Sequence, residues 1–287
     1  MKNKALTLAL FSCVICTAGF GQWTSQLSDD FDSYSFGDQP GGYWYNSSAT
    51  TDTGANSLVT DQDGGTSSTN VTLPANNLGG GNALYFFDTS GGATRAAMNV
   101  SSTGSNFDVV RVSFDFSLPT IVSGTDTFGV ITLTSAGNTN FSSSSDRAVS
   151  ISVKNNGQLV WSGGSHTLSN PSSAHSLSIV ANGTDSDYSY AALDGSGTST
   201  ISSYSFDLYV DDALIKTSIA FSTDSVELGR FGFTTFGGAQ GDFMIDNLEM
   251  YSAAIPEAST MMLLAMSLGL LPMALRYRAR RKSRTNS

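Results

Sequence analysis

The segment VRVSFDFSL (residues 110–118) decides how the chain is expected to fold. Apolar residues at positions 110, 112, 114, 116 and 118 alternate with polar residues at positions 111, 113, 115 and 117. Successive side chains of a β-strand point to opposite faces, so this period of two predicts a strand with one apolar and one polar face. Such a strand needs a second layer of structure to cover its apolar face.

The same alternation recurs further along the chain and predicts a hairpin. Residues 149–154 (VSISVK) alternate in the same way, and Asn156-Gly157 separates them from QLVW (158–161). An Asn-Gly pair between two such runs favours a hairpin with a type I′ turn. Further alternating segments lie near residues 177–179, 206–210 and 231–233, and residues 243–251 are expected to form the last strand.

No convincing helical period appears before residue 255, and 29 glycines with abundant Ser, Thr, Asn and Asp supply turns between the strands. Ten or more half-buried strands predict two antiparallel sheets packed face to face. The expected fold class is therefore all-β, a two-sheet antiparallel sandwich. A single domain of residues 22–252 accounts for these strands.

The charge of this body is strongly negative. Between residues 22 and 255 there are 23 acidic and six basic residues, a net charge of −17. Nucleic acid would repel such a surface, so that class of partner is excluded.

The first 21 residues, MKNKALTLALFSCVICTAGFG, form the pattern of a secretory signal peptide. Two lysines precede an apolar run, and small residues follow it, with cleavage expected after Ala18 or Gly21. Both cysteines, Cys13 and Cys16, lie in this segment. The mature chain is therefore expected to lack disulfides, thiolate metal sites and a cysteine nucleophile.

The last 35 residues, 253–287, read as a sorting tail. Residues 258–275 carry no charge, which is close to the length that crosses a bilayer, and a membrane helix is expected at 260–277. Six basic residues follow in the tail at 276–284, and such clusters stay on the cytoplasmic side. The sequence therefore predicts an exported body anchored by one C-terminal transmembrane helix.

The tail also resembles a known signal. The motif at 255–260 precedes the apolar helix and the basic cluster, and this order is similar to the PEP-CTERM sorting signal of bacteria with exopolysaccharide-rich envelopes. The resemblance implies an exosortase, a membrane-embedded cysteine protease-transpeptidase, as a partner. The motif residues are Pro256, Glu257, Ala258, Ser259 and Thr260. Ala258 replaces the second proline of the usual motif, which affects the expectation of processing but not that of membrane insertion.

The body resembles the concanavalin A-like, or laminin G-type, jelly roll. The segments that carry the resemblance are DDFDSY (29–34), GGYW (41–44), FDLYVDD (206–212) and IDNLEMY (245–251). Such a fold implies first and last strands that lie side by side. Members of the class bind glycans, hydrolyse them or serve as adhesion modules, which makes exopolysaccharide or another glycan an expected partner.

The sequence lacks the carboxylate pattern of the glycosidases of this class. Their mechanism needs two carboxyl groups about 5 Å apart, and no strand carries acidic residues at i, i+2 and i+4. His166 and His175 are expected to lie in solvated loops, without a partner motif for a catalytic triad. No catalytic residue is therefore assigned, and the chain is not expected to be an enzyme.

Two kinds of binding residue remain. If the first and last strands are neighbours, Asp30, Asp32 and Asp246 can meet and hold a Ca²⁺ ion, the cofactor that the sequence favours. The alternative is that they accept hydrogen bonds from backbone amides. The candidate glycan-binding aromatics are Tyr43, Trp44, Tyr45 and Trp161, with a place in the core as the alternative.

Together these patterns indicate an exported protein of a bacterial cell surface or extracellular matrix, either envelope-anchored or processed by exosortase. Its expected role is structural or glycan-associated and not catalytic. Two alternatives stay open: a secreted glycan-active hydrolase that uses an Asp pair, and a matrix filler without a ligand.

Overall fold

The computed structural model describes residues 23–41, 44–46, 55–67, 71–88, 97–100, 105–120, 126–137, 147–223, 227–235 and 239–253. Within these ranges no helix is long and apolar enough to cross a membrane. The chain divides into two compact units, Met1–Ala253 and Ala254–Ser287. The predicted signal peptide, sorting motif, transmembrane segment and basic tail all lie outside the described residues.

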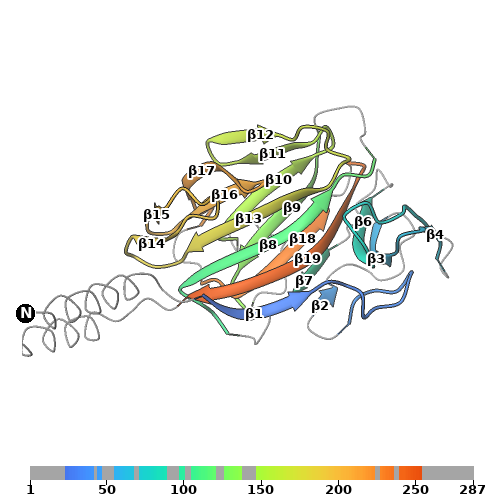
Figure 1. The fold of residues 1–287 in the computed structure, drawn as a ribbon, viewed down its shortest axis with the longest axis horizontal. Coiled ribbons are helices and arrows are strands. Elements are labelled where there is room, and N and C mark those ends of the chain that lie inside the picture. Colours follow the sequence, from blue (N-terminus) through green and yellow to red (C-terminus); the bar gives the residue numbers. More distant parts are fainter. Residues whose placement is uncertain are drawn as a thin grey trace, which may run out of the picture. The chain divides into compact units, whose positions relative to one another are not determined.

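Two antiparallel sheets make up the body (Figure 1). The first, called sheet A here, has strands in the order β17 (Ala213–Ala220), β16 (Ser205–Val210), β13 (His175–Asn182), β8 (Val109–Ser117), β19 (Gly241–Ala253), β6 (Ala83–Asp88) and β3 (Ala55–Thr60), and β1 (Trp23–Asp29) pairs with β19. The second, sheet B, has the order β12 (Gly164–Thr167), β11 (Gln158–Trp161), β10 (Val149–Lys154), β9 (Thr127–Thr134), β18 (Arg230–Thr235), β7 (Ala97–Val100) and β2 (Trp44–Asn46). Two small hairpins complete the structure: β14 (Tyr188–Ala191) with β15 (Thr198–Ile201), and β4 (Gly65–Thr66) with β5 (Thr72–Leu73).

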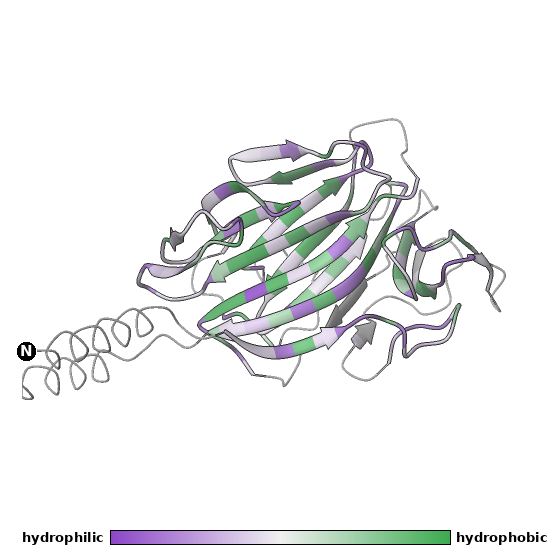
Figure 2. Cartoon of the chain, in the orientation of Figure 1, coloured by the Kyte–Doolittle hydropathy of each residue, from purple (hydrophilic) through white to green (hydrophobic). Residues whose placement is uncertain are grey.

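Aromatic rings fill the space between the sheets. Phe233 of sheet B stacks on Phe243 of sheet A with ring centroids 4.1 Å apart, and it also contacts Phe86 at 4.8 Å. Phe231 contacts Phe114 of β8 at 5.2 Å. These rings come from alternate positions of their strands, as the period of two requires. Figure 2 shows apolar and polar positions alternating along β8 and β13. The predicted all-β, two-sheet sandwich is therefore confirmed.

The predicted hairpin of β10 and β11 is present, but its turn differs from the expected type. A type I′ turn needs positive φ at both central residues, whereas only Gly157 (φ 83) is left-handed and Asn156 is not. The Gly157 amide donates to the Lys154 carbonyl at 3.0 Å. A Cβ at position 157 would lie 2.1 Å from Pro171, so close packing against this proline requires the glycine.

The first and last strands are neighbours, as the resemblance to the jelly roll implied. Strand β1 pairs with the second half of β19, from Trp23 opposite Ala253 to Asp29 opposite Leu248. The first half of β19 pairs on the same side with β6, while β8 runs along its other side. The change of partner coincides with a bulge between Asp246 and Glu249, where Asn247 has φ 51. Asparagine is among the few residues that tolerate this left-handed conformation.

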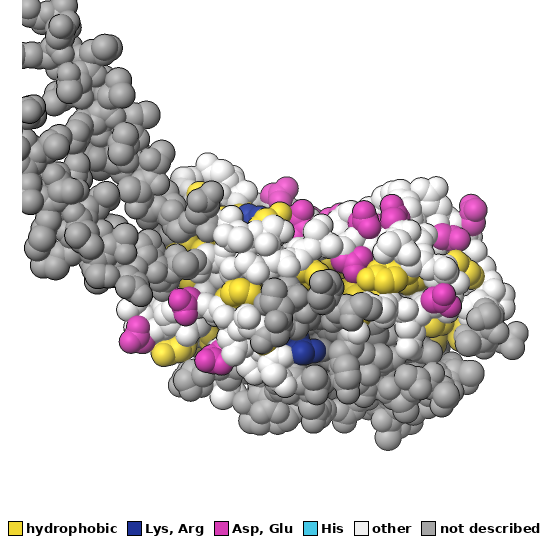
Figure 3. All heavy atoms as spheres, turned by 90° about the horizontal axis from the view of Figure 1, so that it is seen from below, with side chains coloured by type: hydrophobic (Ala, Val, Ile, Leu, Met, Phe, Trp, Pro, Cys, Tyr) yellow, Lys and Arg dark blue, Asp and Glu magenta, His cyan; other side chains and the backbone are white. Residues whose placement is uncertain are grey.

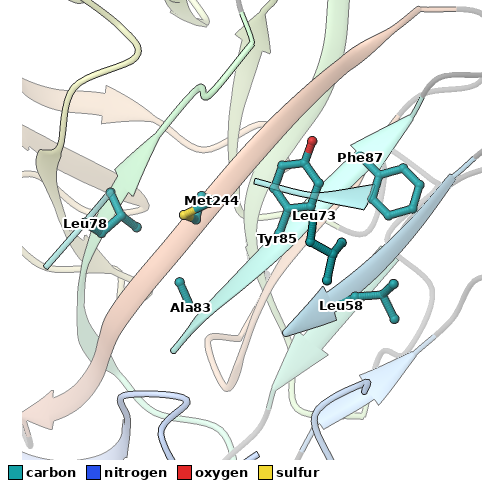
Figure 4. Packing of buried hydrophobic residues seen from close by; sticks show 7 residues of the cluster. All are labelled: Leu58, Leu73, Leu78, Ala83, Tyr85, Phe87 and Met244. Carbon is teal, nitrogen blue, oxygen red and sulfur yellow. The ribbon is translucent and has the colours of Figure 1, made fainter. Parts of the chain in front are cut away.

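Two segments cover parts of the outer face of sheet A. The chain between β3 and β6 covers one part, and its leucines pack with side chains from β3, β6 and β19 (Figure 4). This cluster consists of Leu58, Leu73, Leu78, Ala83, Tyr85, Phe87 and Met244. The hairpin of β14 and β15 covers another part, over β16. Strands β8, β13 and the second half of β19 lie between the two covers.

The carboxylate of Asp207 ties the β14–β15 hairpin to sheet A. Asp207 lies on β16 and is fully buried. Its Oδ2 accepts hydrogen bonds from the Tyr190 hydroxyl at 2.6 Å and the Ser199 hydroxyl at 3.1 Å. Its Oδ1 accepts from the Thr217 hydroxyl at 2.9 Å and the Ser218 amide at 2.7 Å. Burial and this carboxylate raise the pKa of the Tyr190 phenol, so the phenol remains a donor.

Replacing this carboxylate by an amide should loosen the hairpin. In Asp207→Asn one oxygen becomes an NH₂ group that faces donors, and we expect the free energy of unfolding in urea to fall by about 1–3 kcal/mol. Asp187→Asn, at an exposed position just before β14, should change it by less than about 0.5 kcal/mol. Equal effects of the two substitutions would contradict the role given to Asp207.

Candidate functional site

The strip of sheet A between the two covers forms an open groove of about 520 Å³. Its floor comes from alternate, outward-facing positions of three strands, and its walls come from the β14–β15 loop and the β16–β17 turn. The lining side chains are Arg111, Ser113 and Asp115 of β8, Ser176 and Ser178 of β13, Asn247 and Glu249 of β19, and Leu193 and Asp212 of the walls. The polar face predicted for residues 110–118 therefore forms part of this groove.

Strand register arranges the floor in rows. Ser113 lies opposite Ser178 on one side and Glu249 on the other. The Ser178 hydroxyl donates to the Ser113 hydroxyl at 3.0 Å. One row further along, the side-chain amide of Asn247 donates to the Asp115 carboxylate at 2.9 Å. The floor thus presents hydroxyl, amide and carboxylate groups side by side.

Aromatic rings hold the basic side chain of the groove. The Arg111 guanidinium lies 4.1 Å from the centroid of the Tyr251 ring and 5.5 Å from that of Trp23. Both distances fall within the range of cation–π attraction. The Tyr251 hydroxyl donates to Glu249 at 3.0 Å, and burial followed by this bond raises the pKa of the phenol. Arg111, Tyr251 and Glu249 therefore form one connected group at the end of the groove beside β1.

Acidic groups outnumber basic ones in the groove. Its charged side chains are Arg111 against Asp115, Asp212 and Glu249, which gives a formal net charge of −2. On the face of the molecule shown in Figure 3, acidic side chains likewise outnumber Lys and Arg. The groove therefore favours ligands that are neutral or positively charged.

A buried carboxylate, Asp246, adjoins the groove beside Asn247. Asp246 is 1% exposed, and its Oδ1 accepts from the Asn247 amide at 2.7 Å. Burial, with smaller contributions from the nearby carboxylates of Asp115 and Asp32, raises its pKa to about 6. A charged Asp246 is therefore costly unless an additional positive charge lies beside it.

The Asp32 carboxylate is near enough to Asp246 to contribute to its raised pKa. The Asn82 amide donates to Asp32 Oδ1 at 2.7 Å, and a Cβ at Gly81 would lie 2.0 Å from the same oxygen. Gly81, with φ 84, thus lets the chain pass directly over this carboxylate. Asp30 is exposed and accepts the Asp32 amide at 3.2 Å. Among the described side chains, no group of three or more His, Cys, Asp or Glu is arranged to hold a metal.

Of the predicted aromatic residues, the two whose side chains are described, Trp44 and Trp161, do not line the groove. Trp44 and Trp161 are each 8% exposed. The Trp44 indole donates to Asp29 at 2.7 Å and packs on Phe31. Only the backbone of Tyr45 is described, and Tyr43 lies outside the described residues. Neither tryptophan offers an exposed ring face to a glycan.

The expectation that both histidines lie in solvated loops is wrong. His166 is on β12 and partly exposed, and His175 begins β13 and is buried. His175 Nδ1 lies 2.9 Å from Asp211 Oδ2, and Nε2 lies 3.2 Å from the Asn170 carbonyl. These contacts join β13 to the β16–β17 turn and to the loop before β13. Both ring nitrogens of His175 thus contact oxygen atoms of neighbouring segments.

Comparison with known proteins does not assign the chain to a family. No protein-family profile matches the sequence, and no curated protein matches it. Solved structures similar in arrangement include the cellulose-induced protein Cip1, with a TM-score of 0.47, 11% identity, and coverage of 80% of this chain and 98% of that one. An endo-1,3-β-glucanase from Streptomyces sioyaensis has a TM-score of 0.45, 14% identity and coverage of 81% and 97%. The potassium-bound carbohydrate recognition domain of Emp46p has a TM-score of 0.41, 14% identity and coverage of 60% and 84%. These similarities carry no argument about activity.

The raised pKa of Asp246 predicts a pH-dependent stability. The folded protein binds this proton more tightly than the unfolded chain, so in the presence of chelator the contribution of Asp246 to the free energy of unfolding should fall as pH rises from 3.8 to about 6. Above that range it should be constant. Urea unfolding across this range should show a flatter profile for Asp246→Asn than for the wild type and for the exposed-site control Asp63→Asn. Identical profiles for the wild type and Asp246→Asn would contradict the assignment.

Proposed function

We propose that the chain is an exported β-sandwich protein of a bacterial cell surface or extracellular matrix that binds glycan without cleaving it. The observation that supports this most is the open polar groove on the outer face of sheet A. Sugars are recognised by convergent hydrogen-bonding groups together with an apolar surface. The hydrogen-bonding groups come from Ser113, Ser178, Asn247 and Glu249, and the apolar surface comes from the Leu193 side chain.

The cellular location in this proposal rests on the sequence signals alone. The signal peptide supports export, and the apolar segment with its basic tail supports anchoring in the membrane. The motif at 256–260 supports recognition by an exosortase-type protease. These three signals agree with one another on a body that faces away from the cytoplasm.

Filling the floor of the groove should remove glycan binding. Ser178 is partly buried at its centre, so Ser178→Trp should reduce binding of the full-length chain to a glycan panel below detection by calorimetry. Ser152→Trp, at a partly exposed position on β10 of sheet B, is the matched control and should bind like the wild type. Glu249→Ala removes a polar group without adding volume. Its expected loss of glycan affinity tests the proposal if Ser178→Trp fails to fold. Wild-type binding by Ser178→Trp and Glu249→Ala, or no binding by the wild type, would reject the proposal.

A hydrolase is the second candidate because two carboxylates, Asp115 and Glu249, line the same groove. Retaining and inverting glycosidases both need such a pair. Each carboxylate already accepts a hydrogen bond from a neighbouring side chain, Asn247 or Tyr251. Release of reducing sugar from a bound glycan, lost in both Asp115→Asn and Glu249→Gln, would favour this candidate over binding alone.

We also propose that Asp32 and Asp246 hold a Ca²⁺ ion. The two carboxylates supply hard oxygen ligands, and the remaining ligands would be amide or carbonyl oxygens and water. An ion there would offset the cost of a charged, buried Asp246. It would also join the segment after β1 to the end of the β6–β19 pairing.

Calcium should therefore stabilise the protein, in proportion to its occupancy. At about one hundred times its Kd, calcium would add about 2.7 kcal/mol to the free energy of unfolding. The gain should shrink below pH of about 6, where a proton competes for Asp246. Thermal unfolding with calcium and then with chelator checks this, with Asp246→Asn expected to lose the response and Asp63→Asn to keep it. If calcium does not stabilise the wild type, the proposed ion site is wrong, and Asp32 and Asp246 act only as hydrogen-bond acceptors.

A further inference from the structure

We propose that the groove selects glycans that carry free amino groups, such as glucosamine polymers, over neutral and acidic glycans. This inference rests on the proposed glycan-binding function and assigns a ligand class to the same groove. The structural basis is the placement of two carboxylates on a hydroxyl-rich floor and of a third on its wall, with one basic group that aromatic rings already engage.

The carboxylates are distributed along the groove and not gathered at one point. Glu249 and Asp115 lie on different rows of the floor, two positions apart along the register of β8 with β19. Asp212 comes from the β16–β17 turn at the opposite side of the floor. A chain of sugars lying in the groove would therefore meet a carboxylate at more than one place. Repeated ammonium groups along one polymer match this arrangement.

The single cation of the groove lies at its end beside β1. The Arg111 guanidinium is 4.1 Å from the centroid of the Tyr251 ring and 5.5 Å from that of Trp23, where the ring electrons attract it. The carboxylates of Asp115 and Asp212 lie further along the groove. An acidic sugar lying along the groove would therefore meet more carboxylates than basic groups.

The hydroxyl and amide groups of the floor can form hydrogen bonds with sugar hydroxyls. The Ser178 hydroxyl donates a hydrogen bond to the Ser113 hydroxyl. Both hydroxyl oxygens keep lone pairs that can accept hydrogen bonds from sugar hydroxyls. Asn247 donates one amide hydrogen to Asp115 and keeps a second donor and its carbonyl oxygen. A peptide rich in lysine would satisfy the carboxylates but not this array of short polar groups. The geometry therefore points to an amino sugar as the occupant.

The test compares oligosaccharides of equal length with the full-length chain in detergent, by calorimetry at mildly acidic pH and low salt. The probes are oligomers of glucosamine, of N-acetylglucosamine and of galacturonic acid, with oligolysine of the same charge as a peptide probe. We expect the glucosamine oligomer to bind most tightly and the galacturonic acid oligomer to bind least. Added salt should weaken the binding of the glucosamine oligomer, but not that of the N-acetylglucosamine oligomer.

Two isosteric variants locate the effect. Glu249→Gln and Asp212→Asn should each lower the affinity for the glucosamine oligomer about threefold to fivefold, the range for a partly exposed ion pair. Both should lower the affinity for the N-acetylglucosamine oligomer less than the affinity for the glucosamine oligomer. Asp63→Asn, an exposed carboxylate away from the groove, is the matched control and should bind both oligomers like the wild type.

The outcomes separate this inference from the proposed function. Equal affinity for the glucosamine and N-acetylglucosamine oligomers would overturn the selection for amino groups while leaving glycan binding intact. An equal loss in Asp63→Asn, or oligolysine that binds as tightly as the glucosamine oligomer with the same dependence on Glu249, would also overturn it. Failure of every glycan to bind would overturn both proposals.

Discussion

Strand β19 changes its hydrogen-bonding partner on one side at a left-handed residue, Asn247, and the rest of the structure depends on this change. Before it, the strand pairs with β6, and after it with β1, while β8 accompanies both halves. At this bulge the Asn247 backbone amide donates to Asp246, and the Asn247 side chain donates to Asp115. The left-handed conformation of Asn247 thereby lies where β19 begins to pair with β1 and at one side of the groove.

The period-two patterns were sufficient to predict the sandwich, because burial of one strand face is a local property of the sequence. The strand expected at 110–118 is β8, Val109–Ser117, and its Phe114 contacts Phe231 of sheet B. The turn after β10 was harder to predict, since Gly157 packs against Pro171, which lies beyond the hairpin strands. Burial of His175 likewise depends on Asp211, 36 residues away.

The candidate site was only partly predictable. The approach of Asp32 to Asp246 followed from the expected pairing of the first and last strands. The groove was missed because its floor joins three strands that are distant in the sequence, and the polar face of β8 is equally compatible with open solvent. The β14–β15 hairpin, which Asp207 ties to sheet A, and the β16–β17 turn form the walls that make that polar face part of a groove. A run of aromatics such as YWY does not reveal which ring is buried, and Trp44 faces Asp29.

The pairing of Trp23 with Ala253 has a mechanical consequence. A force that separates these two residues would open the β1–β19 ladder one hydrogen bond at a time, which requires little force. A force directed along the 13-residue strand β19 would instead load its hydrogen bonds to β8 together. The β1–β19 ladder therefore resists separation of Trp23 from Ala253 only weakly, whereas β19 strongly resists sliding along β8.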